Sequence, residues 1–579
     1  MIDRELSFEA FNAKKLTASE VAKSFVVPDT FRSIAGTDHS YLIGPRGSGK
    51  TTLLRMLTTE SLNAWQGAEA KEIKKQINFW SVFLPTDQLW SQQASESHAR
   101  SLFALQGLYA FTESASYLSL PSSGSGVRIG PGEERKLVTN LAEGWGLDVA
   151  APTLLGLQQE VDRRLIAVGR GDQTALELGN GTALSLLDFS VRTFNRVVDR
   201  VGKKWALLLD EMELAPRVIH EEVNAYVRGG SGELLIKVSM SPFDRFIDSD
   251  QSSGVPVPGH DFRVVHLSGQ ARHDIERITI GLWRETLKSR GLPAISMERA
   301  LGGSTFDYGY RGKTSKARIA AYLEDAYLED NSFAEWVRRR RVDLAHIDEM
   351  TYQEYSATVR KVYPLLVFRR SLLNFSDGNV VGRRSGRRAT DPFVGVTAVT
   401  TALEGNPRWI KIAFSEMVDH WDMKRSQVSA GYQLSALLGL SSRFEALLRV
   451  LPRPESMAHS MSVMDLVNVV AKYMSDANLG SFHADPVNVF TVDRNAPPPV
   501  LDAIITGLYA GAIVHVRDRL SPDVLDTFAG QRFRLAYVFG LRPGREFPLR
   551  LGKDVRLSSI VQPQNGGADR DVQLEFDWS

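Results

Sequence analysis

The feature that most constrains this chain is a glycine-rich loop set between an apolar run and a helical run. The loop reads Gly44, Pro45, Arg46, Gly47, Ser48, Gly49, Lys50, Thr51 and Thr52, which has the spacing GxxxxGK[ST]. Before it, His39–Ile43 is mostly apolar and suits a buried strand, and after it Leu53–Leu57 begins a helix. This arrangement predicts an α/β fold in which a parallel sheet binds its ligand at the carboxyl ends of the strands.

Each residue type in the loop has a chemical reason to be there. Gly44, Gly47 and Gly49 let the backbone turn its N–H groups toward phosphate oxygens. The helix that follows adds the positive end of its dipole. Lys50 would reach the β- and γ-phosphates, and Thr51 would ligate Mg²⁺. We therefore expect this loop to bind ATP together with magnesium.

A second apolar run, Trp205–Leu209, ends in the acidic sequence Asp210-Glu211-Met212-Glu213. An apolar strand that ends in Asp-Glu is typical of the second half of an ATP site. Asp210 is then expected to hold the magnesium shell, and Glu211 to polarise the attacking water. A surface strand that ends in acidic residues without any function would have the same sequence. Because the chain also has the glycine-rich loop, we favour the catalytic interpretation. The chain is therefore predicted to be an ATPase, with Glu211 and Lys50 as catalytic residues.

Two further segments are predicted to complete the sheet. Glu233–Ser241 falls where the next strand is expected, and Phe262–Leu267 reads as another. A polar residue at the end of the first of these can contact the γ-phosphate or the attacking water. Ser239 and Ser241 are both candidates, and ordinary turn chemistry explains a serine there equally well.

Length and composition bound the remaining possibilities. A chain of 579 residues is too long for one hydrophobic core, so we expect about two to four domains. The chain has no cysteine, which excludes disulfides and thiolate metal sites and fits a reducing cytoplasm. No run of about 18 apolar residues predicts a membrane-spanning helix, and Met1–Lys15 lacks the apolar core of a signal peptide. Because no nucleophile motif or metal-ligand spacing stands out, any nuclease or protease chemistry is expected from a partner.

Charge is balanced overall but uneven along the chain. With 69 basic and 68 acidic residues, no global charge drives the protein onto nucleic acid. The basic residues gather in the stretch Arg338–Arg341 and again at Arg369, Arg370, Arg383, Arg384, Arg387 and Arg388. Two interpretations are compatible with this pattern. One is a solvated helix face together with a loop, and the other is a surface that contacts phosphates.

The runs Phe11–Leu16 and Val21–Phe25, followed by the loop Gly44–Thr52, resemble bacterial ATPases grouped as origin-recognition-complex-like AAA+ proteins. Further along, Gly405-Asn406-Pro407-Arg408 is similar to the sensor-2 motif, in which an arginine of a helical lid reaches the nucleotide phosphates. The resemblance implies this catalytic part for Arg408. A helix start with Asn406 as cap and Pro407 in the first turn explains the same letters.

The resemblance also implies an oligomer in which an arginine finger enters the neighbouring subunit's site. Arg228, Arg245 and Arg263 are the candidates, and the sequence does not choose among them. The implied fold is a P-loop AAA+ parallel sheet with a helical lid, two insertions and a C-terminal winged-helix-like domain. The predicted parts are an AAA+ core at 1–290 with an insertion at about 90–190, an inserted arginine-rich region at 291–394, a lid at 395–440, a winged-helix-like domain at 441–560 and a flexible tail at 561–579.

The C-terminal domain prediction depends on two helices and two strands. Ser462–Tyr473 and Pro497–Gly511 are expected as helices, and Ala512–Arg517 and Arg532–Phe539 as strands. Origin-recognition-like proteins bind duplex DNA through such a domain. These helices carry few Lys or Arg, however, so a protein contact remains an equal alternative.

Two functions are therefore expected. The first is an ATP-hydrolysing switch that assembles into oligomers and acts on double-stranded DNA or with a DNA-acting effector. The resemblance places such proteins in bacterial phage defence or mobile elements. The alternative is an ATP-gated signalling scaffold that recruits a protein effector without DNA.

Overall fold

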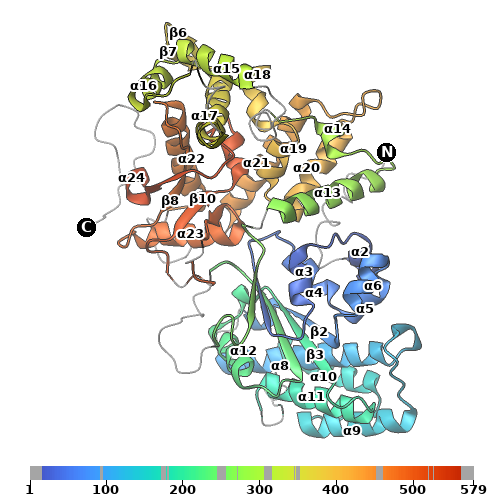
Figure 1. Ribbon diagram of the computed structural model, residues 1–579. Coiled ribbons are helices and arrows are strands. Elements are labelled where there is room, and N and C mark those ends of the chain that lie inside the picture. The colour runs from blue at the N-terminus through green and yellow to red at the C-terminus, as the bar shows by residue number, and fades with distance from the viewer. Residues whose placement is uncertain are drawn as a thin grey trace. The chain divides into compact units, whose positions relative to one another are not determined.

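The computed structural model describes residues 16–91, 95–170, 172, 178, 181–243, 256–269, 272–304, 316–344, 346, 352–451, 461–518, 521–523, 525 and 527–561. The chain divides into two compact units, which are described separately below (Figure 1). The first unit holds the described residues of Met1–Leu267 and Pro522–Asp526, and the second holds the others.

The first unit is built on a five-stranded parallel sheet in the order β2-β3-β4-β1-β5. Its strands are β1 (Ser40–Ile43), β2 (Phe79–Pro85), β3 (Lys204–Asp210), β4 (Leu234–Met240) and β5 (Arg263–His266). Every residue of β1 and β4 is buried, as expected of parallel strands covered on both faces. The strands predicted from apolar runs at 39–43, 205–209, 233–241 and 262–267 are all present, and β2 was not predicted.

The two faces of the sheet carry two separate hydrophobic cores, because side chains alternate along each strand. Leu207 and Leu209 of β3 belong to a core with the helices α8–α12, whereas Ala206 and Leu208 belong to a core with α2–α6. The helices of this unit are α2 (Ala18–Lys23), α3 (Asp29–Ile34), α4 (Lys50–Met56), α5 (Thr59–Ala64), α6 (Ala68–Lys74), α7 (Gln88–Ser91), α8 (Glu96–Leu118), η1 (Pro121–Ser123), α9 (Pro131–Trp145), α10 (Leu154–Gly169), α11 (Ala183–Val197), η3 (Met212–Leu214) and α12 (Arg217–Gly229).

The helices α8–α11, which occupy the segment at about 90–190, share the core of the sheet. The ring of Phe111 in α8 lies 5.2 Å from that of Trp205 in β3 and 6.4 Å from that of Trp145 in α9. Trp145 also donates a hydrogen bond to Ser190 of α11 at 2.9 Å. One face of the sheet is therefore closed by this segment itself (Figure 1).

The second unit combines helices with a four-stranded sheet in the order β11-β8-β10-β9 and a two-stranded hairpin, β6-β7. Its strands are β6 (Leu373–Ser376), β7 (Asn379–Arg383), β8 (Val487–Thr491), β9 (Ile513–His515), β10 (Arg532–Leu535) and β11 (Lys553–Arg556). Its helices are α13 (Arg272–Ser289), α14 (Met297–Leu301), α15 (Lys316–Glu329), α16 (Asn331–Arg340), α17 (Tyr352–Leu372), α18 (Arg387–Thr390), η5 (Asp391–Phe393), α19 (Val396–Leu403), α20 (Pro407–Asp419), α21 (Ala430–Val450), α22 (Val463–Leu479), α23 (Pro498–Ala510), η6 (Tyr537–Leu541) and α24 (Leu557–Val561).

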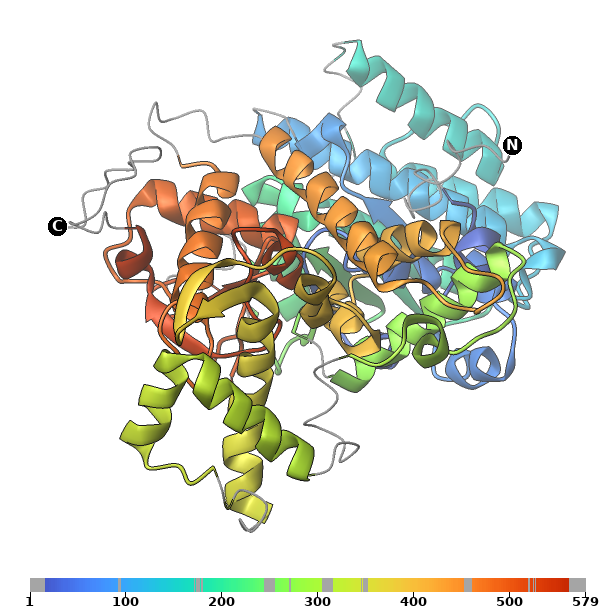
Figure 2. The ribbon, with the colours of Figure 1, turned by 90° about the horizontal axis from the view of Figure 1, so that it is seen from above.

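A buried arginine joins α15–α17 to the C-terminal part of this unit. Arg369 of α17 forms an ion pair of 2.8 Å with Asp330, the N-cap of α16. It also donates to the carbonyl oxygens of Asn478 and Gly480, at the end of α22, at 3.1 and 2.6 Å. The two regions lie side by side in both views (Figures 1 and 2).

Several elements differ from the sequence prediction. The segment predicted as a strand at Arg532–Phe539 is a strand only to Leu535, and a 3-10 helix follows from Tyr537. α13 belongs to the second unit, where its Trp283 packs on Phe414 of α20 at 5.1 Å. α21 runs without a break from Ala430 to Val450.

Two remaining predictions concern membrane-spanning helices and the C-terminal tail. No helix among the residues that the structure describes is both long and apolar enough to cross a bilayer. The predicted tail at 561–579 lies outside the described residues from Gln562 onward.

Candidate functional site

The loop between β1 and α4 adopts a backbone that requires its glycines. Gly47 and Gly49 have φ angles of +86° and +95°, in the left-handed region that only glycine enters freely. At Gly44, an added Cβ would meet Ser48 Oγ at 2.6 Å and Leu267 Cβ at 2.9 Å. All three glycines predicted to shape the loop are thus needed for its observed conformation.

The loop side chains divide into buried and exposed ones. Ser48 is buried and donates its hydroxyl to the carbonyl oxygen of Pro45 at 2.8 Å. Arg46 is exposed, whereas Thr51 and Thr52 are half-buried at the start of α4. A hydrogen bond within the loop therefore stabilises it, while the Arg46 side chain is exposed.

A hydrogen-bond network joins the loop to the carboxyl ends of β3 and β4. Thr51 Oγ1 donates to Asp210 Oδ2 at 2.7 Å, and Ser239 Oγ donates to Asp210 Oδ1 at 2.5 Å. Asp210 is fully buried, so both of its oxygens depend on such donors. β4 lies between β1 and β3 in the sheet, which places Ser239 next to this carboxylate. The structure thus brings Thr51 and Asp210 together as the sequence predicted.

Glu211 follows Asp210 in an unusual backbone conformation. Its φ of +58° lies in the left-handed region, which is uncommon for a residue other than glycine. The backbone N–H of Glu211 donates to Ser239 Oγ at 2.9 Å, so the same serine holds both acidic residues. The Glu211 side chain is half-buried. Its backbone is therefore fixed relative to Asp210.

Of the two serines considered at the end of β4, only Ser239 joins the acidic pair. Ser241 Oγ donates to the carbonyl oxygen of Phe243 at 2.7 Å and accepts from the Phe243 N–H at 3.4 Å. That pattern is ordinary turn chemistry.

Lys50 is buried and turned back against the loop. Its Nζ donates to the carbonyl oxygen of Gly44 at 2.6 Å and to that of Pro45 at 3.4 Å. It also lies 3.6 Å from Glu213 Oε1. Burial raises the pKa of the Glu213 carboxyl, and the positive charge of Lys50 opposes that rise. Glu213 was not predicted as a site residue, since nothing in the run Asp210–Glu213 distinguishes it from its acidic neighbours.

The sequence predicts Arg408 as the sensor arginine. Arg408 lies in α20 of the second unit, where Asn406 Oδ1 accepts from the N–H groups of Arg408 and Trp409 at 3.1 and 3.3 Å. The helix-cap interpretation of this motif is therefore correct, and the sensor role of Arg408 stays a prediction.

The three candidate arginine fingers have different surroundings. Arg228 is exposed in the last turn of α12. Arg263 of β5 forms an exposed ion pair with Asp38 at 3.1 Å. Arg245 lies outside the described residues.

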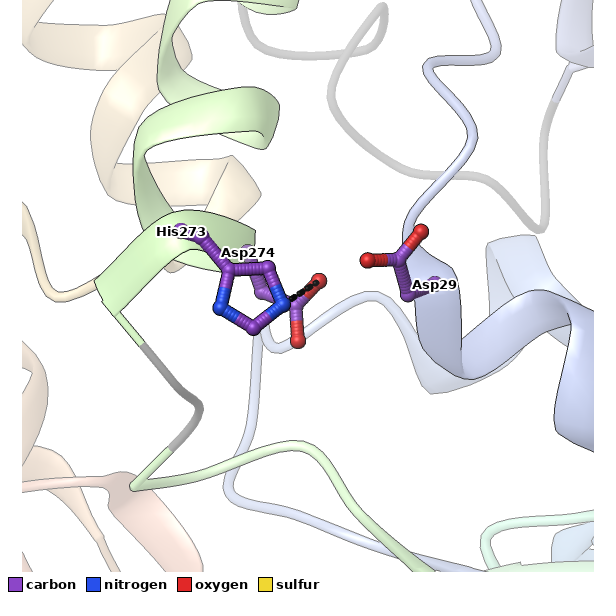
Figure 3. A group of neighbouring side chains, drawn as sticks. All are labelled: Asp29, His273 and Asp274. Atoms are coloured by element: carbon purple, nitrogen blue, oxygen red, sulfur yellow. Dashed lines mark ion pairs between the residues drawn. The ribbon is translucent and has the colours of Figure 1, made fainter.

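Acidic and histidine side chains also occur at the starts of helices. His273 and Asp274 form an ion pair of 3.8 Å at the beginning of α13 (Figure 3). Asp29, drawn in the same figure, is the first residue of α3 and belongs to the first unit.

Comparison with known proteins gives one family. The model of the family described as ORC-CDC6-like matches residues 7–557. The matched range includes both segments that were predicted as insertions, at about 90–190 and 291–394. No curated protein matches the chain.

Proposed function

The chain belongs to the ORC-CDC6-like family, and we propose that it is an AAA+ ATPase that binds ATP and Mg²⁺ at the loop Gly44–Thr52. One observation carries the proposal: the hydrogen bond from Thr51 to Asp210, which joins the loop to the acidic end of β3. A hydroxyl and a carboxylate at one place are the oxygen ligands that Mg²⁺ prefers. Thr51 and Asp210 would hold the ion, which when bound neutralises phosphate charge.

The proposed roles of the other site residues follow from their surroundings. Lys50 would bind the β- and γ-phosphates after leaving the loop carbonyl groups. Glu211 is the proposed base for the attacking water, because its backbone is anchored to Ser239 and its side chain is only half-buried. Arg408 is proposed to contact the phosphates from a lid.

The direct test is nucleotide binding and phosphate release by the full chain. Wild-type protein is expected to bind MgATP and release phosphate. Lys50→Ala should lose nucleotide binding, since it removes the charge that contacts the phosphates. If Lys50→Ala binds MgATP as the wild type does, the assignment of this loop is wrong.

We propose the same domain plan that the resemblance implies. It consists of a core at 1–290 with an insertion at about 90–190, a second insertion at 291–394, a lid at 395–440, a winged-helix-like domain at 441–560 and a tail at 561–579. The four-stranded sheet with α22 and α23 supports the winged-helix assignment. We further propose that the protein forms a homo-oligomer in the cytoplasm. Its arginine finger would be Arg228, Arg245 or Arg263.

The proposed action is on double-stranded DNA or with a DNA-acting effector, in phage defence or a mobile element. Arg338–Arg341 supports DNA contact, since all four residues are exposed at the end of α16. An observation that favours the alternative, a signalling scaffold, is the composition of α22 and α23, which carry one lysine and no arginine. DNA binding that weakens steeply with rising salt would support the first function, and salt-independent recruitment of a protein would support the second.

A further inference from the structure

Glu213 is a second carboxylate at the phosphate-binding loop, and it has no role in the function proposed so far. It lies in η3, directly after β3, with its Oε1 3.6 Å from Lys50 Nζ. The Lys50 and Glu213 side chains are only 7% and 8% exposed. The other oxygen, Oε2, is buried without a hydrogen-bond partner among the residues that the structure describes.

A carboxylate in this position depends on its counter-charge. Removing a carboxylate from water is costly unless an opposite charge and hydrogen bonds compensate for it. With Oε2 unpartnered, Lys50 supplies the compensation. The direction of the Glu213 pKa agrees, since burial raises it and Lys50 opposes the rise.

The lysine is equally engaged. An ammonium group has three donors, and Lys50 directs them at the Gly44 carbonyl oxygen, the Pro45 carbonyl oxygen and Glu213. To contact a phosphate, Lys50 must therefore give up the interactions that it makes here. The interaction with Glu213 carries a full opposite charge, so it is the strongest competitor of a phosphate for this lysine.

We propose that Glu213 is a positioning residue that holds Lys50 against the loop carbonyl groups, competes with the nucleotide phosphates for it, and so lowers the affinity for nucleotide. The inference rests on the proposed nucleotide binding at Gly44–Thr52. Such a residue favours release of the product, because Lys50 has a ready partner when ADP leaves.

The test is the affinity of the full chain for MgADP, measured by calorimetry. Glu213→Gln keeps the size of the side chain and removes its charge, so MgADP should bind about tenfold more tightly, the worth of one charge-assisted interaction. The matched control is Glu222→Gln, which removes another partly buried carboxylate of the first unit, one that accepts from the Leu184 N–H at 2.9 Å instead of pairing with Lys50; its MgADP affinity should stay unchanged. AMP, which lacks the β-phosphate, should bind both variants as it binds wild type.

Tighter binding by Glu213→Gln is a gain that misfolding does not produce. The proposal is overturned if Glu213→Gln binds MgADP with unchanged or lower affinity while wild type binds, or if Glu222→Gln shows the same gain. Should Glu213→Gln not fold, Glu213→Asp decides, because its shorter side chain draws the charge away from Lys50 and should tighten binding to a smaller extent. If wild type itself does not bind MgADP, the proposed function fails instead.

Discussion

Thr51 Oγ1 lies 2.7 Å from Asp210 Oδ2, although 159 residues separate the two in the chain. The strand order brings them together: β4 lies between β1 and β3, and its Ser239 donates to the second oxygen of Asp210. The carboxylate at the end of β3 is therefore held from β4 and from α4, the helix that follows β1. This arrangement makes the candidate site open to tests with single substitutions.

Replacing Ser239 with alanine should weaken the acidic end of β3. The change removes the hydroxyl that donates to Asp210 and accepts from the Glu211 N–H. Because Asp210 is buried and Glu211 is half-buried, we expect the free energy of unfolding to fall by about 1–3 kcal/mol. ATP turnover should fall more than MgADP affinity, since Glu211 loses its anchor. Ser241→Ala is the matched control, because that serine bonds only within a turn. Equal effects of the two changes would contradict the network.

Alanine at Gly49 should disturb the loop itself. The φ of +95° is unfavourable for a residue with a Cβ by about 1–2 kcal/mol, so the backbone must shift. We expect MgADP affinity to fall about tenfold or more, since the loop N–H groups would lose their alignment. Gly67→Ala is the control: its φ is +114° and nothing lies within 4 Å of its added Cβ. That variant should lose stability and keep affinity; loss of affinity in both would refute the local explanation.

The sequence predicts the sheet better than the site. β1, β3, β4 and β5 were found because parallel strands buried on both faces read as continuous apolar runs. β2, Phe79–Pro85, has the same apolar character, but it was not predicted. The 3-10 helix from Tyr537 was not predicted, because Tyr537–Phe539 is as apolar as a strand.

For the site, the sequence identifies residue types but not their partners. Thr51 and Asp210 were predicted from motif spacing, and the structure brings them together. The contact of Glu213 with Lys50 was not predictable, since it depends on the left-handed backbone at Glu211 and the 3-10 turn that follows. A linear pattern does not encode which of the two glutamates turns inward.

Stability of the first unit should depend on pH through His39. Burial, and then the charge of Lys237, lowers the pKa of His39 to about 4, and Nδ1 accepts from the Ile236 N–H at 2.8 Å. The unfolded chain has a histidine pKa near 6.5, so between about pH 6.5 and 4 it binds more protons than the folded protein. Stability is therefore fully present above that range and falls as pH drops through it, by about 1–2 kcal/mol after allowance for solvent screening.

The check is chemical unfolding followed at several pH values. His39→Asn keeps an acceptor for the Ile236 N–H and has no titrating ring, so its stability should fall less steeply between about pH 6.5 and 4. The same pH dependence in wild type and His39→Asn would show that other groups are responsible.

Arg369 should contribute strongly to the stability of the second unit. Its pair with Asp330 is buried on both sides, and removing one partner of such a pair costs about 3–5 kcal/mol. Arg369→Ala should therefore lower the unfolding midpoint of the second unit strongly. Arg370→Ala breaks a more exposed pair with Glu329 and should cost about 0–1 kcal/mol. Equal destabilisation by both would contradict the account of how α17 is joined to α22.

The central claim, that the loop and the acidic end of β3 form an ATP-hydrolysing site, is tested most directly at Glu211. Glu211→Gln keeps the shape of the side chain and removes its ability to accept a proton from water. Measured side by side, MgATP affinity should stay close to that of wild type while steady-state phosphate release falls by about 100-fold or more. Phosphate release at the wild-type rate by Glu211→Gln would contradict the assignment of Glu211 as the catalytic base.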